Sequence, residues 1–424
     1  MPVARRGFGR WLTAVLLLAL TLLEVLLLVL VFVPLPRRPL LATASVLATS
    51  WSPALAVPAL LGLALAWLLR HRRGTRRRRA GWVVWIALAT STAALASALA
   101  PYAAAWRTAR DLGEGLSVAG QFAGLNYSRG PERDRTLVYA RVGRSRMKMD
   151  VWLPRDHALL PYRTLPRRAL AHGPLLPQGR SGLALRSPRP AVVWVHGGGY
   201  ESGHRSQTPR WNQWLNELGY AVFDIEYRLA PRATQLQQIG DVKCAIGWVR
   251  EHASDYAIDP ARIVLAGTSA GGNLALAAAY TGRDKRPRPS CETGRDTSVR
   301  AVVSFYGPTD MAGMIDAGGD GRADPRVRRF MGGSLMTASE GFRYGSPARL
   351  VRADVPPTLL LHGSHDRIVP VEQARQLNAR LTTAGAEHEY VEIPWADHAF
   401  DYNWGNWGTQ IARPVLARFL RLHA

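Results

Sequence analysis

Lysine is nearly missing from this chain of 424 residues: only three of its 54 basic side chains are Lys, and the others are Arg. Acidic residues are also scarce, and 54 basic minus 31 acidic side chains leave a formal net charge of +23. No helix-turn-helix, zinc-finger or aromatic RNA-binding signature accompanies this charge, so the basic excess does not predict nucleic-acid binding. With 47% hydrophobic residues the composition excludes a disordered polypeptide, and the length allows two or three folded units.

Cysteine is equally rare. Cys244 and Cys291 lie 47 residues apart, with no CxxC pair and no neighbouring pair of His residues. This spacing excludes a zinc knuckle and a redox CxxC motif. A disulfide between the two is compatible only with a location outside a reducing compartment. We expect neither a metal nor an organic cofactor.

Three apolar segments near the N-terminus predict a membrane region over residues 1–106. They lie at about 11–33, 45–69 and 82–105. As a helix, the first segment would measure about 34 Å, enough to cross a hydrocarbon core of ~30 Å. A cleaved signal peptide is the alternative, but its apolar part would be only about 7–15 residues long. We therefore expect three transmembrane helices.

Arginine residues flank these segments unevenly. The N-terminus holds three Arg and residues 70–79 hold seven, whereas the first loop holds only Arg37 and Arg38. Positive charge marks the cytoplasmic side of membrane proteins. With three spans, the chain after Trp106 is then predicted to be extracytoplasmic, in a multi-pass protein of the cell membrane. We interpret Glu24, inside the first span, as a tolerated or helix-pairing residue, with a functional intramembrane acid as the alternative.

After a Gly-rich tether over 107–135, residues 136–424 alternate between predicted strands and helices. Two runs at 137–142 and 147–153 predict a β-hairpin. Residues 155–190, with seven Arg and six Pro, show no period and are interpreted as an exposed insertion. The remaining pattern predicts strands at 191–195, 221–225, 263–266, 301–305, 358–361 and 389–393, and helices at 211–218, 236–252, 270–280, 373–384 and 410–422. Such alternation predicts an α/β fold with a mostly parallel sheet covered by helices on both faces.

The segment 263–272, IVLAGTSAGG, carries a G-x-S-x-G motif between a predicted strand and an Ala-rich helix. In this context the motif predicts a nucleophile elbow, because Gly267 and Gly271 let the chain turn sharply and let the helix pack close to the strand. Ser269 would then expose its hydroxyl at a helix N-terminus, whose dipole favours developing negative charge. A Gly-Ser turn that merely caps the helix is the alternative.

A second glycine-rich turn, His196-Gly197-Gly198-Gly199, directly follows the predicted strand 191–195. Three consecutive glycines cost conformational entropy. They also let backbone N–H groups come close to a developing oxyanion. A flexible loop would not explain why the glycines stand at the end of a sheet strand, so we favour an oxyanion loop.

An acid and a base follow the serine along the chain. Asp366 lies just past the predicted strand 358–361, and His398 lies just past 389–393. A serine hydroxyl needs a base to remove its proton, and the base needs a carboxylate to fix its tautomer and stabilise the imidazolium. We favour Asp366 and His398 for these roles. The rival bases are His362, His365 and His388, and the rival acids are Asp310 and Asp397.

Taken together, these motifs resemble the α/β-hydrolase superfamily, most closely its hormone-sensitive-lipase-like and related bacterial carboxylesterases. The matching segments within residues 136–424 are His196–Tyr200, Tyr227–Pro231, Gly267–Gly272, His362-Gly363 with Asp366, and Asp397-His398. The resemblance implies that Ser269 is the nucleophile and that Asp366 and His398 complete the triad. It also implies an oxyanion hole built from the N–H groups of Gly198, Gly199 and Ala270.

The chain departs from that family pattern in three ways. Thr268 stands where the family more often has an acidic residue, the 155–190 insertion is unusual, and no N-terminal helical cap is visible. These departures concern the substrate class rather than the reaction type. The segment between Asp310 and Pro347 holds four of the seven Met residues, which would suit either an acyl pocket or core packing.

The whole pattern predicts a membrane-anchored serine hydrolase that cleaves carboxylic esters through an acyl-enzyme intermediate. We expect short to medium acyl chains, including lipid-like esters. The alternatives are an acyltransferase with the same triad and a non-catalytic binding protein with a hydrolase fold. The predicted partners are a small-molecule ester and the lipid bilayer, without nucleic acid.

Overall fold

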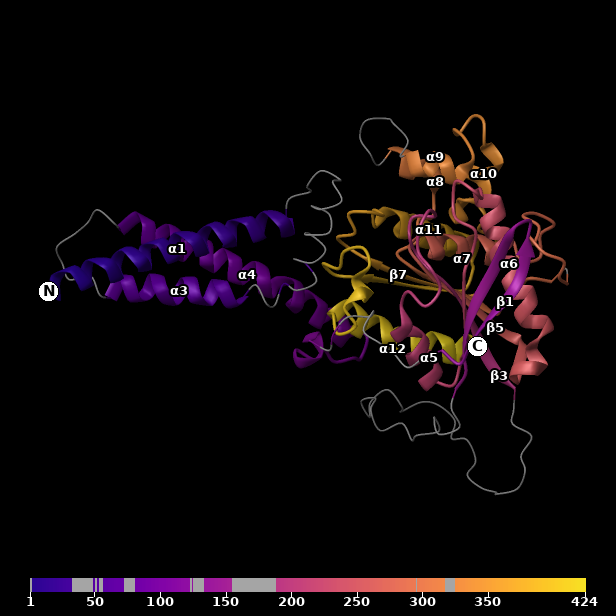
Figure 1. The fold of residues 1–424 in the computed structure, drawn as a ribbon, viewed down its shortest axis with the longest axis horizontal. Coiled ribbons are helices and arrows are strands. Elements are labelled where there is room, and N and C mark those ends of the chain that lie inside the picture. The colour runs from indigo at the N-terminus through magenta and orange to yellow at the C-terminus, as the bar shows by residue number, and fades with distance from the viewer. Residues whose placement is uncertain are drawn as a thin grey trace, which may run out of the picture. The chain divides into compact units, whose positions relative to one another are not determined.

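A computed structural model of the chain describes residues 2–32, 56–71, 81–122, 133–154, 188–294, 296–316 and 325–424, with the single residues 49, 52 and 124. Two compact units are distinguished in it (Figure 1). The N-terminal unit is formed mainly by Met1–Asp111, and the C-terminal unit by the chain from Leu112 onward.

The N-terminal unit consists, in its described part, of three long helices. They are α1 (Pro2–Phe32), α3 (Ala56–His71) and α4 (Gly81–Asp111). Each coincides with one predicted span, although α3 begins later than residue 45 and α4 continues past residue 105. Among the described residues, Val84–Asp111 is the one helix long and apolar enough to cross a membrane, while Val15–Leu30 and Ala56–Arg70 are shorter apolar helices. Length and composition therefore support one of the three predicted spans.

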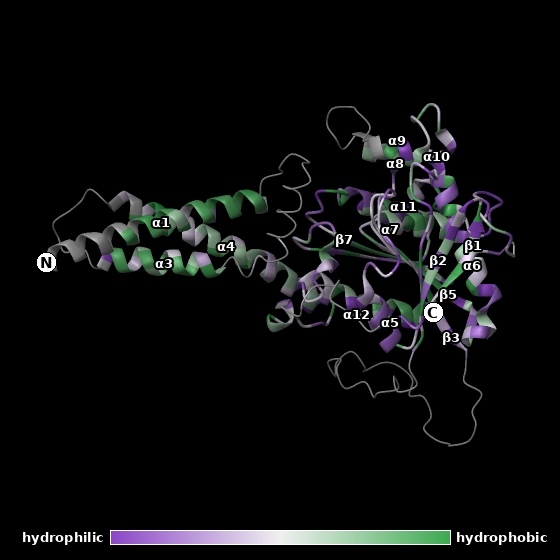
Figure 2. Ribbon diagram, in the orientation of Figure 1, coloured by the Kyte–Doolittle hydropathy of each residue, from purple (hydrophilic) through white to green (hydrophobic). Residues whose placement is uncertain are grey.

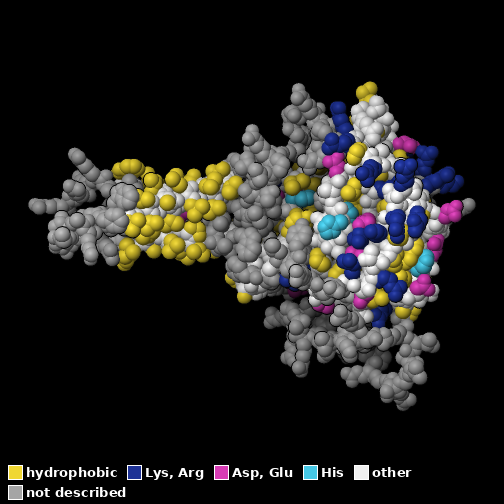
Figure 3. Space-filling model, viewed as in Figure 1, with side chains coloured by type: hydrophobic (Ala, Val, Ile, Leu, Met, Phe, Trp, Pro, Cys, Tyr) yellow, Lys and Arg dark blue, Asp and Glu magenta, His cyan; other side chains and the backbone are white. Residues whose placement is uncertain are grey.

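Glu24 lies inside this three-helix unit. The Ser91 hydroxyl on α4 donates to both oxygens of the Glu24 carboxyl, at 2.9 and 3.0 Å, and both residues are buried. Gly62 on α3 makes room for the pair, because a Cβ atom there would lie 2.3 Å from Ser91 Oγ. Glu24 thus links α1 to α4, which agrees with its interpretation as a helix-pairing residue. The outer faces of the helices carry exposed Leu, Val and Trp side chains (Figures 2 and 3).

The C-terminal unit is built around an eight-stranded sheet with the order β1-β2-β4-β3-β5-β6-β7-β8. The antiparallel strands β1 and β2 pair with each other, and β2 pairs antiparallel with β4, while all the other neighbours are parallel. The strands are β1 (Arg135–Val142), β2 (Ser145–Trp152), β3 (Arg189–Val195), β4 (Ala221–Ile225), β5 (Ile258–Thr268), β6 (Ala301–Phe305), β7 (Thr358–Gly363) and β8 (His388–Ile393). The predicted α/β fold with a mostly parallel sheet is confirmed.

Helices cover both faces of this sheet. Figure 1 shows α5 and α12 on one face, with α6, α7 and α11 on the other. Because both faces are covered, strands such as β4 and β6 are buried along their full length, and all residues of the two are apolar except Asp224 and Ser304. The helices are α5 (Pro209–Glu217), α6 (Gln235–Glu251), α7 (Ala270–Tyr280), α8 (Met311–Asp316), α9 (Pro325–Met331), α10 (Ser339–Tyr344), α11 (Glu372–Ala384) and α12 (Trp407–His423), with short 3-10 turns η3 (Ala119–Phe122), η5 (Ala253–Tyr256), η6 (Pro347–Arg349) and η7 (Phe400–Tyr402).

Three segments differ from their prediction or lie outside the description. Residues 107–111 of the predicted tether belong to α4, and Ser117 and Gly124 are hydrogen-bonded to Gln410 and to the backbone of Trp404. Most of the predicted insertion, 155–187, lies outside the described residues, and its last two positions already belong to β3. The described residues of the segment 310–347 form α8, α9 and α10, which the sequence pattern did not predict.

A covalent and a polar contact fasten the loop after α7 to α6. Cys244 on α6 forms a disulfide with Cys291, their Cα atoms being 5.6 Å apart. The neighbouring Lys243 is buried and donates to the carbonyl oxygens of Thr281 and Pro287. Burial lowers the pKa of Lys243 to about 8, against the opposing attraction of Asp284. The loop is therefore held to α6 at Thr281, Pro287 and Cys291.

Candidate active site

Ser269 occupies a sharp turn between β5 and α7. Its backbone has φ 53° and ψ −121°, a conformation that is costly for a non-glycine residue. The turn is tight enough to require glycine on both sides. A Cβ atom on Gly267 would lie 2.4 Å from the carbonyl oxygen of Gly271, and one on Gly271 would lie 2.2 Å from that of Val195. The Ser269 N–H donates to the Phe305 carbonyl at 2.9 Å, which ties the turn to β6.

His398 joins Ser269 to Asp366. Its Nε2 atom lies 2.9 Å from Ser269 Oγ, and its Nδ1 atom lies 2.8 Å from Asp366 Oδ2. An Nδ1–H donated to the carboxylate leaves the Nε2 lone pair free to accept the serine proton. The three residues come from loops after β5, β7 and β8, so they meet where the parallel strands end.

The Asp366 carboxylate is held in its charged form. Burial alone would raise its pKa, but the charge of His398 and hydrogen bonds from His362 and His398 outweigh burial and hold the pKa well below its usual range. The other carboxylate oxygen accepts from the backbone N–H groups of Ile368 and Val369, at 2.9 and 2.7 Å. Asp366 is therefore an anion at any pH at which the enzyme would work, and it is oriented toward the imidazole.

The glycine-rich loop after β3 lies beside the serine. Gly198 and Gly199 both have positive φ, 121° and 60°. A Cβ atom on Gly198 would lie 2.1 Å from the Ser202 carbonyl oxygen, so no other residue fits there without a shift of the backbone. Within the described part of the chain, no protein acceptor takes a hydrogen bond from the Gly198 or Gly199 N–H. Together with Ala270, the first residue of α7, they can serve an oxyanion.

Two aromatic rings support this loop from behind. His196 stacks on Tyr227 with ring centroids 4.3 Å apart, and the Tyr227 hydroxyl donates to the His196 carbonyl at 3.1 Å. Burial lowers the pKa of His196 to about 4, although a hydrogen bond to the Gly197 carbonyl opposes the shift. His196 is therefore neutral near pH 7, and it supports the loop by packing against Tyr227. The two segments that resemble the family, 196–200 and 227–231, are thus in contact through His196 and Tyr227.

The rival acids and bases considered from the sequence have other partners. Asp310 accepts from the backbone of Ala312 and pairs with Arg349. His388 contacts Asn378 on α11 and the Ala386 carbonyl. His362 does approach the triad, but through Asp366, at 3.3 Å from its Oδ2. Ser269, Asp366 and His398 are therefore the three that the fold brings together.

Only some residues of the Met-containing segment 310–347 pack near the glycine-rich loop after β3. Phe330 on α9 stacks on Tyr200 with centroids 3.6 Å apart, and the Tyr200 hydroxyl lies 3.7 Å from Met311 Sδ. Arg329 forms an ion pair with Glu201 at 2.5 Å. Met336, in contrast, is 93% exposed. The segment thus places an apolar wall next to Tyr200, while its tip faces solvent.

Residues without a recognisable motif also surround the triad. The Tyr306 ring packs edge-on against the His398 imidazole, with centroids 4.7 Å apart. Asp401, three residues after His398, accepts hydrogen bonds from Tyr306 and Trp211. Sequence reasoning missed these residues, and the one available signal was that Tyr306 directly follows a strand end.

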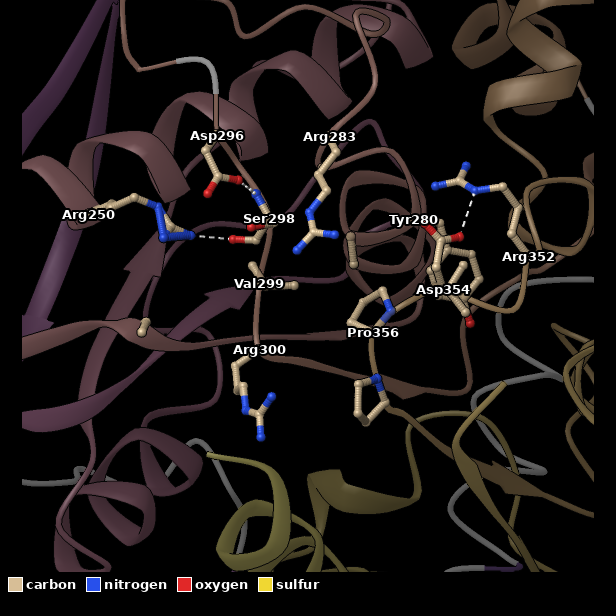
Figure 4. Close-up of a pocket in the computed structure, with 15 residues that line it drawn as sticks. Arg250, Tyr280, Arg283, Asp296, Ser298, Val299, Arg300, Arg352, Asp354 and Pro356 are labelled. Atoms are coloured by element: carbon tan, nitrogen blue, oxygen red, sulfur yellow. Dashed lines mark hydrogen bonds and ion pairs between the residues drawn. The ribbon is translucent and has the colours of Figure 1, made fainter. Parts of the chain in front are cut away.

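A cavity of about 420 Å³ lies away from this constellation (Figure 4). Arg300 and Pro357, which precede β6 and β7, contribute to its wall, so it opens where the parallel strands begin rather than where they end. In its lining, Arg250 donates to the Ser298 carbonyl and Arg352 pairs with Asp354 at 3.1 Å. None of the candidate catalytic residues lines it. Among the described residues there is also no group of His, Cys, Asp and Glu that could hold a metal ion.

The C-terminal unit has the α/β-hydrolase fold and carries a Ser–His–Asp constellation. Comparison with known proteins agrees: residues 183–381 match the model of the family BD-FAE. The probable carboxylic ester hydrolase LipM of Mycobacterium tuberculosis is 37% identical over 225 residues, 52% of this chain and 52% of LipM. Esterase LipQ of the same organism is 36% identical over 225 residues, 52% of this chain and 53% of LipQ. The chain thus spans about half the length of the curated relatives it matches.

A solved structure shares the fold. The apo form of Thermogutta terrifontis esterase 2 superposes with a TM-score of 0.52 and 24% sequence identity, covering 70% of this chain and 94% of the esterase. At this identity the likeness concerns the fold alone. The domain is therefore similar in fold, and in the sequence of its central part, to esterases.

Proposed function

We propose that this protein is a serine carboxylesterase anchored in a membrane. The observation that carries the catalytic part is the pair of distances from His398, 2.9 Å to Ser269 Oγ and 2.8 Å to Asp366 Oδ2. This geometry allows nucleophilic attack on an acyl group, because a serine hydroxyl, a base and a buried carboxylate are hydrogen-bonded in sequence. The similarity to LipM and LipQ, both described as ester hydrolases, favours esters over other acyl compounds.

In the proposed reaction, His398 Nε2 takes the proton of Ser269 as Oγ attacks the ester carbonyl carbon. The N–H groups of Gly198, Gly199 and Ala270 stabilise the oxyanion that forms. Asp366 stabilises the imidazolium, which then gives its proton to the alcohol as the C–O bond breaks. Water, activated by the same imidazole, hydrolyses the acyl-enzyme and releases the acid. Transfer to another acceptor in place of water would make the enzyme an acyltransferase.

The proposed acyl group is short to medium, about two to eight carbons. The apolar wall of Tyr200, Met311 and Phe330 beside the oxyanion loop would accommodate such chains. Hydrolysis of p-nitrophenyl esters from acetate to palmitate tests this, with rates expected to fall beyond about eight carbons. A maximum at palmitate would instead indicate a lipase-like pocket. No hydrolysis of any ester would favour the non-catalytic alternative.

The support for the proposed anchoring is the long apolar helix α4, the shorter apolar helices within α1 and α3, and the distribution of Arg. Their outward-facing Leu, Val and Trp side chains would be unfavourable in water but suit hydrocarbon. The Arg-rich residues 70–79 favour a cytoplasmic location for the second loop and an extracytoplasmic catalytic domain. The disulfide between Cys244 and Cys291 suits that side of the membrane, because cytoplasmic thiols are kept reduced.

A further inference from the structure

A second buried carboxylate lies next to the triad. The Asp401 side chain is fully buried, and both of its oxygens accept hydrogen bonds. The Trp211 Nε1–H donates to Oδ2 at 2.8 Å, and the Tyr306 hydroxyl donates to Oδ1. Hydrogen-bond donors around a carboxyl group stabilise its ionised form. Burial raises the pKa of Asp401 above its usual value, and the two donors and the charge of His398 offset this rise only in part.

The carboxylate is connected to His398 by two short routes. Along the chain, Asp401 follows His398 by three residues, after Ala399 with φ 56°. Through space, the Tyr306 ring that Asp401 holds packs edge-on against the imidazole, at 4.7 Å between centroids and 64° between planes. This ring contact limits the orientations open to the imidazole. Asp401 therefore restrains the ring that restrains the imidazole.

Trp211, the second donor to Asp401, is anchored in the core. Trp211 is fully buried on α5 and packs against Phe305, with centroids 5.1 Å apart. The Phe305 carbonyl accepts the Ser269 N–H, and the Tyr306 N–H donates to the Leu361 carbonyl on β7 at 2.8 Å. The strand end at 305–306 thus contacts the nucleophile, the base and the strand that precedes Asp366.

We propose that Asp401 and Tyr306 are a positioning pair for His398, and that the Asp401 charge also stabilises the imidazolium. This inference rests on the proposed serine hydrolase function. When His398 takes up the serine proton, its positive charge forms near two carboxylates: Asp366, which it touches, and Asp401, behind the Tyr306 ring. Two other titratable side chains lie near the base: His362, which contacts Asp366, and Asp397, the residue before His398.

Three single variants of the full-length protein test the pair. Asp401→Asn removes the charge with little change of shape, and Tyr306→Phe removes the hydroxyl but keeps the ring. Tyr280→Phe is the matched control, because its buried hydroxyl is bonded to Thr358 rather than to any residue of the site. We expect kcat for a p-nitrophenyl ester to fall about 10-fold in the first two variants with KM nearly unchanged, and to change less than about 2-fold in the control.

The pH profile separates positioning from a merely structural role. Loss of the Asp401 charge disfavours the protonated imidazole, so the acid limb of kcat/KM should move to lower pH in Asp401→Asn and stay in place in Tyr306→Phe. Wild-type kcat and an unmoved acid limb in a folded Asp401→Asn variant would overturn the proposal. So would an equal loss of kcat in Tyr280→Phe. If Asp401→Asn fails to fold, Tyr306→Phe with wild-type kcat is sufficient to overturn it.

A fluorophosphonate probe makes the test independent of the ester. In that reaction Ser269 Oγ forms a bond to phosphorus, fluoride leaves, and His398 takes the serine proton. A wild-type chain that is not labelled at Ser269 would refute the proposed function itself. Labelling that is fast in wild type and about 10-fold slower in both Asp401→Asn and Tyr306→Phe supports the positioning pair. Equal labelling rates in all variants would leave the hydrolase standing and reject the pair.

Discussion

The Nε2 atom of His398 lies 2.9 Å from Oγ of Ser269, although 129 residues separate the two along the chain. The contact exists because β5 and β8 are parallel strands of one sheet whose ends point to the same edge. Asp366 reaches the other ring nitrogen from the strand between them in sequence. The proposed chemistry depends on this meeting of three loops.

His398→Ala should lower kcat/KM for ester hydrolysis by about 10³-fold or more, because Ser269 then has no base. Since the residues of a triad act as a unit, adding Ser269→Ala should lower it little further. Steady-state kinetics of the single and double variants measure both effects. His388→Ala, a base remote from the triad, is the control. Near-normal activity of His398→Ala would remove this residue from the mechanism.

His196 should make the protein less stable in mild acid. The unfolded chain takes up a proton on this imidazole below about pH 6.5, whereas in the folded protein burial lowers the pKa to about 4. Between these values the unfolded state binds more protons, so the free energy of unfolding falls as the pH falls from about 6.5 to about 4. His196→Gln should therefore lose Tm less steeply over this range than wild type.

Thermal unfolding of the detergent-solubilised chain at several pH values measures this slope. His388→Gln provides the control, because His388 contacts Asn378 on α11 and the Ala386 carbonyl rather than the glycine-rich loop. Its Tm should change with pH in parallel with that of wild type. Parallel curves for wild type and His196→Gln would contradict the prediction.

The disulfide should contribute substantially to stability. Closing a loop of 47 residues lowers the conformational entropy of the unfolded chain, which raises the free energy of unfolding by about 4 kcal/mol in the chain-entropy treatment. The double variant Cys244→Ser with Cys291→Ser should therefore unfold at a clearly lower temperature than the oxidised wild type. Alkylation of the unfolded, unreduced wild-type protein should label no thiol. Two alkylated cysteines would show that the bond is not formed.

Topology can be tested with two reporter fusions. A reporter after Ala424 should behave as extracytoplasmic, and one inserted within residues 70–79 as cytoplasmic, because Arg-rich loops are retained on the cytoplasmic side. Alkaline phosphatase and a fluorescent protein report the two sides in complementary ways. The opposite result at both positions would invert the orientation and remove the reason for a disulfide at Cys244.

The sequence was most informative where local patterns carry the fold. The short, mainly apolar runs at 191–195, 221–225 and 301–305 predicted buried strands, because a strand covered on both faces carries apolar side chains on both sides. The elbow around Ser269 was predictable because only glycine fits at 267 and 271. Such constraints act between residues that are near one another in the chain.

Other features depend on contacts that no local pattern records. Tyr306 and Asp401 lie 95 residues apart, and neither belongs to a recognisable motif, so their hydrogen bond could not be predicted. The helices α8, α9 and α10 are only six or seven residues long and hold their shape by packing against residues such as Tyr200. Helices of this length are too short to show a 3.6-residue hydrophobic period in the sequence. The Glu24–Ser91 contact likewise joins two helices 67 residues apart.

The most direct test of the proposed function is the hydrolysis of p-nitrophenyl butyrate by purified wild type and by Ser269→Ala, assayed side by side. A serine esterase built on this triad predicts steady turnover by wild type and a rate at least about 10³-fold lower for the variant, with both proteins folded to the same Tm within a few degrees. Equal rates in the two proteins would show that Ser269 is not the nucleophile and would contradict the account.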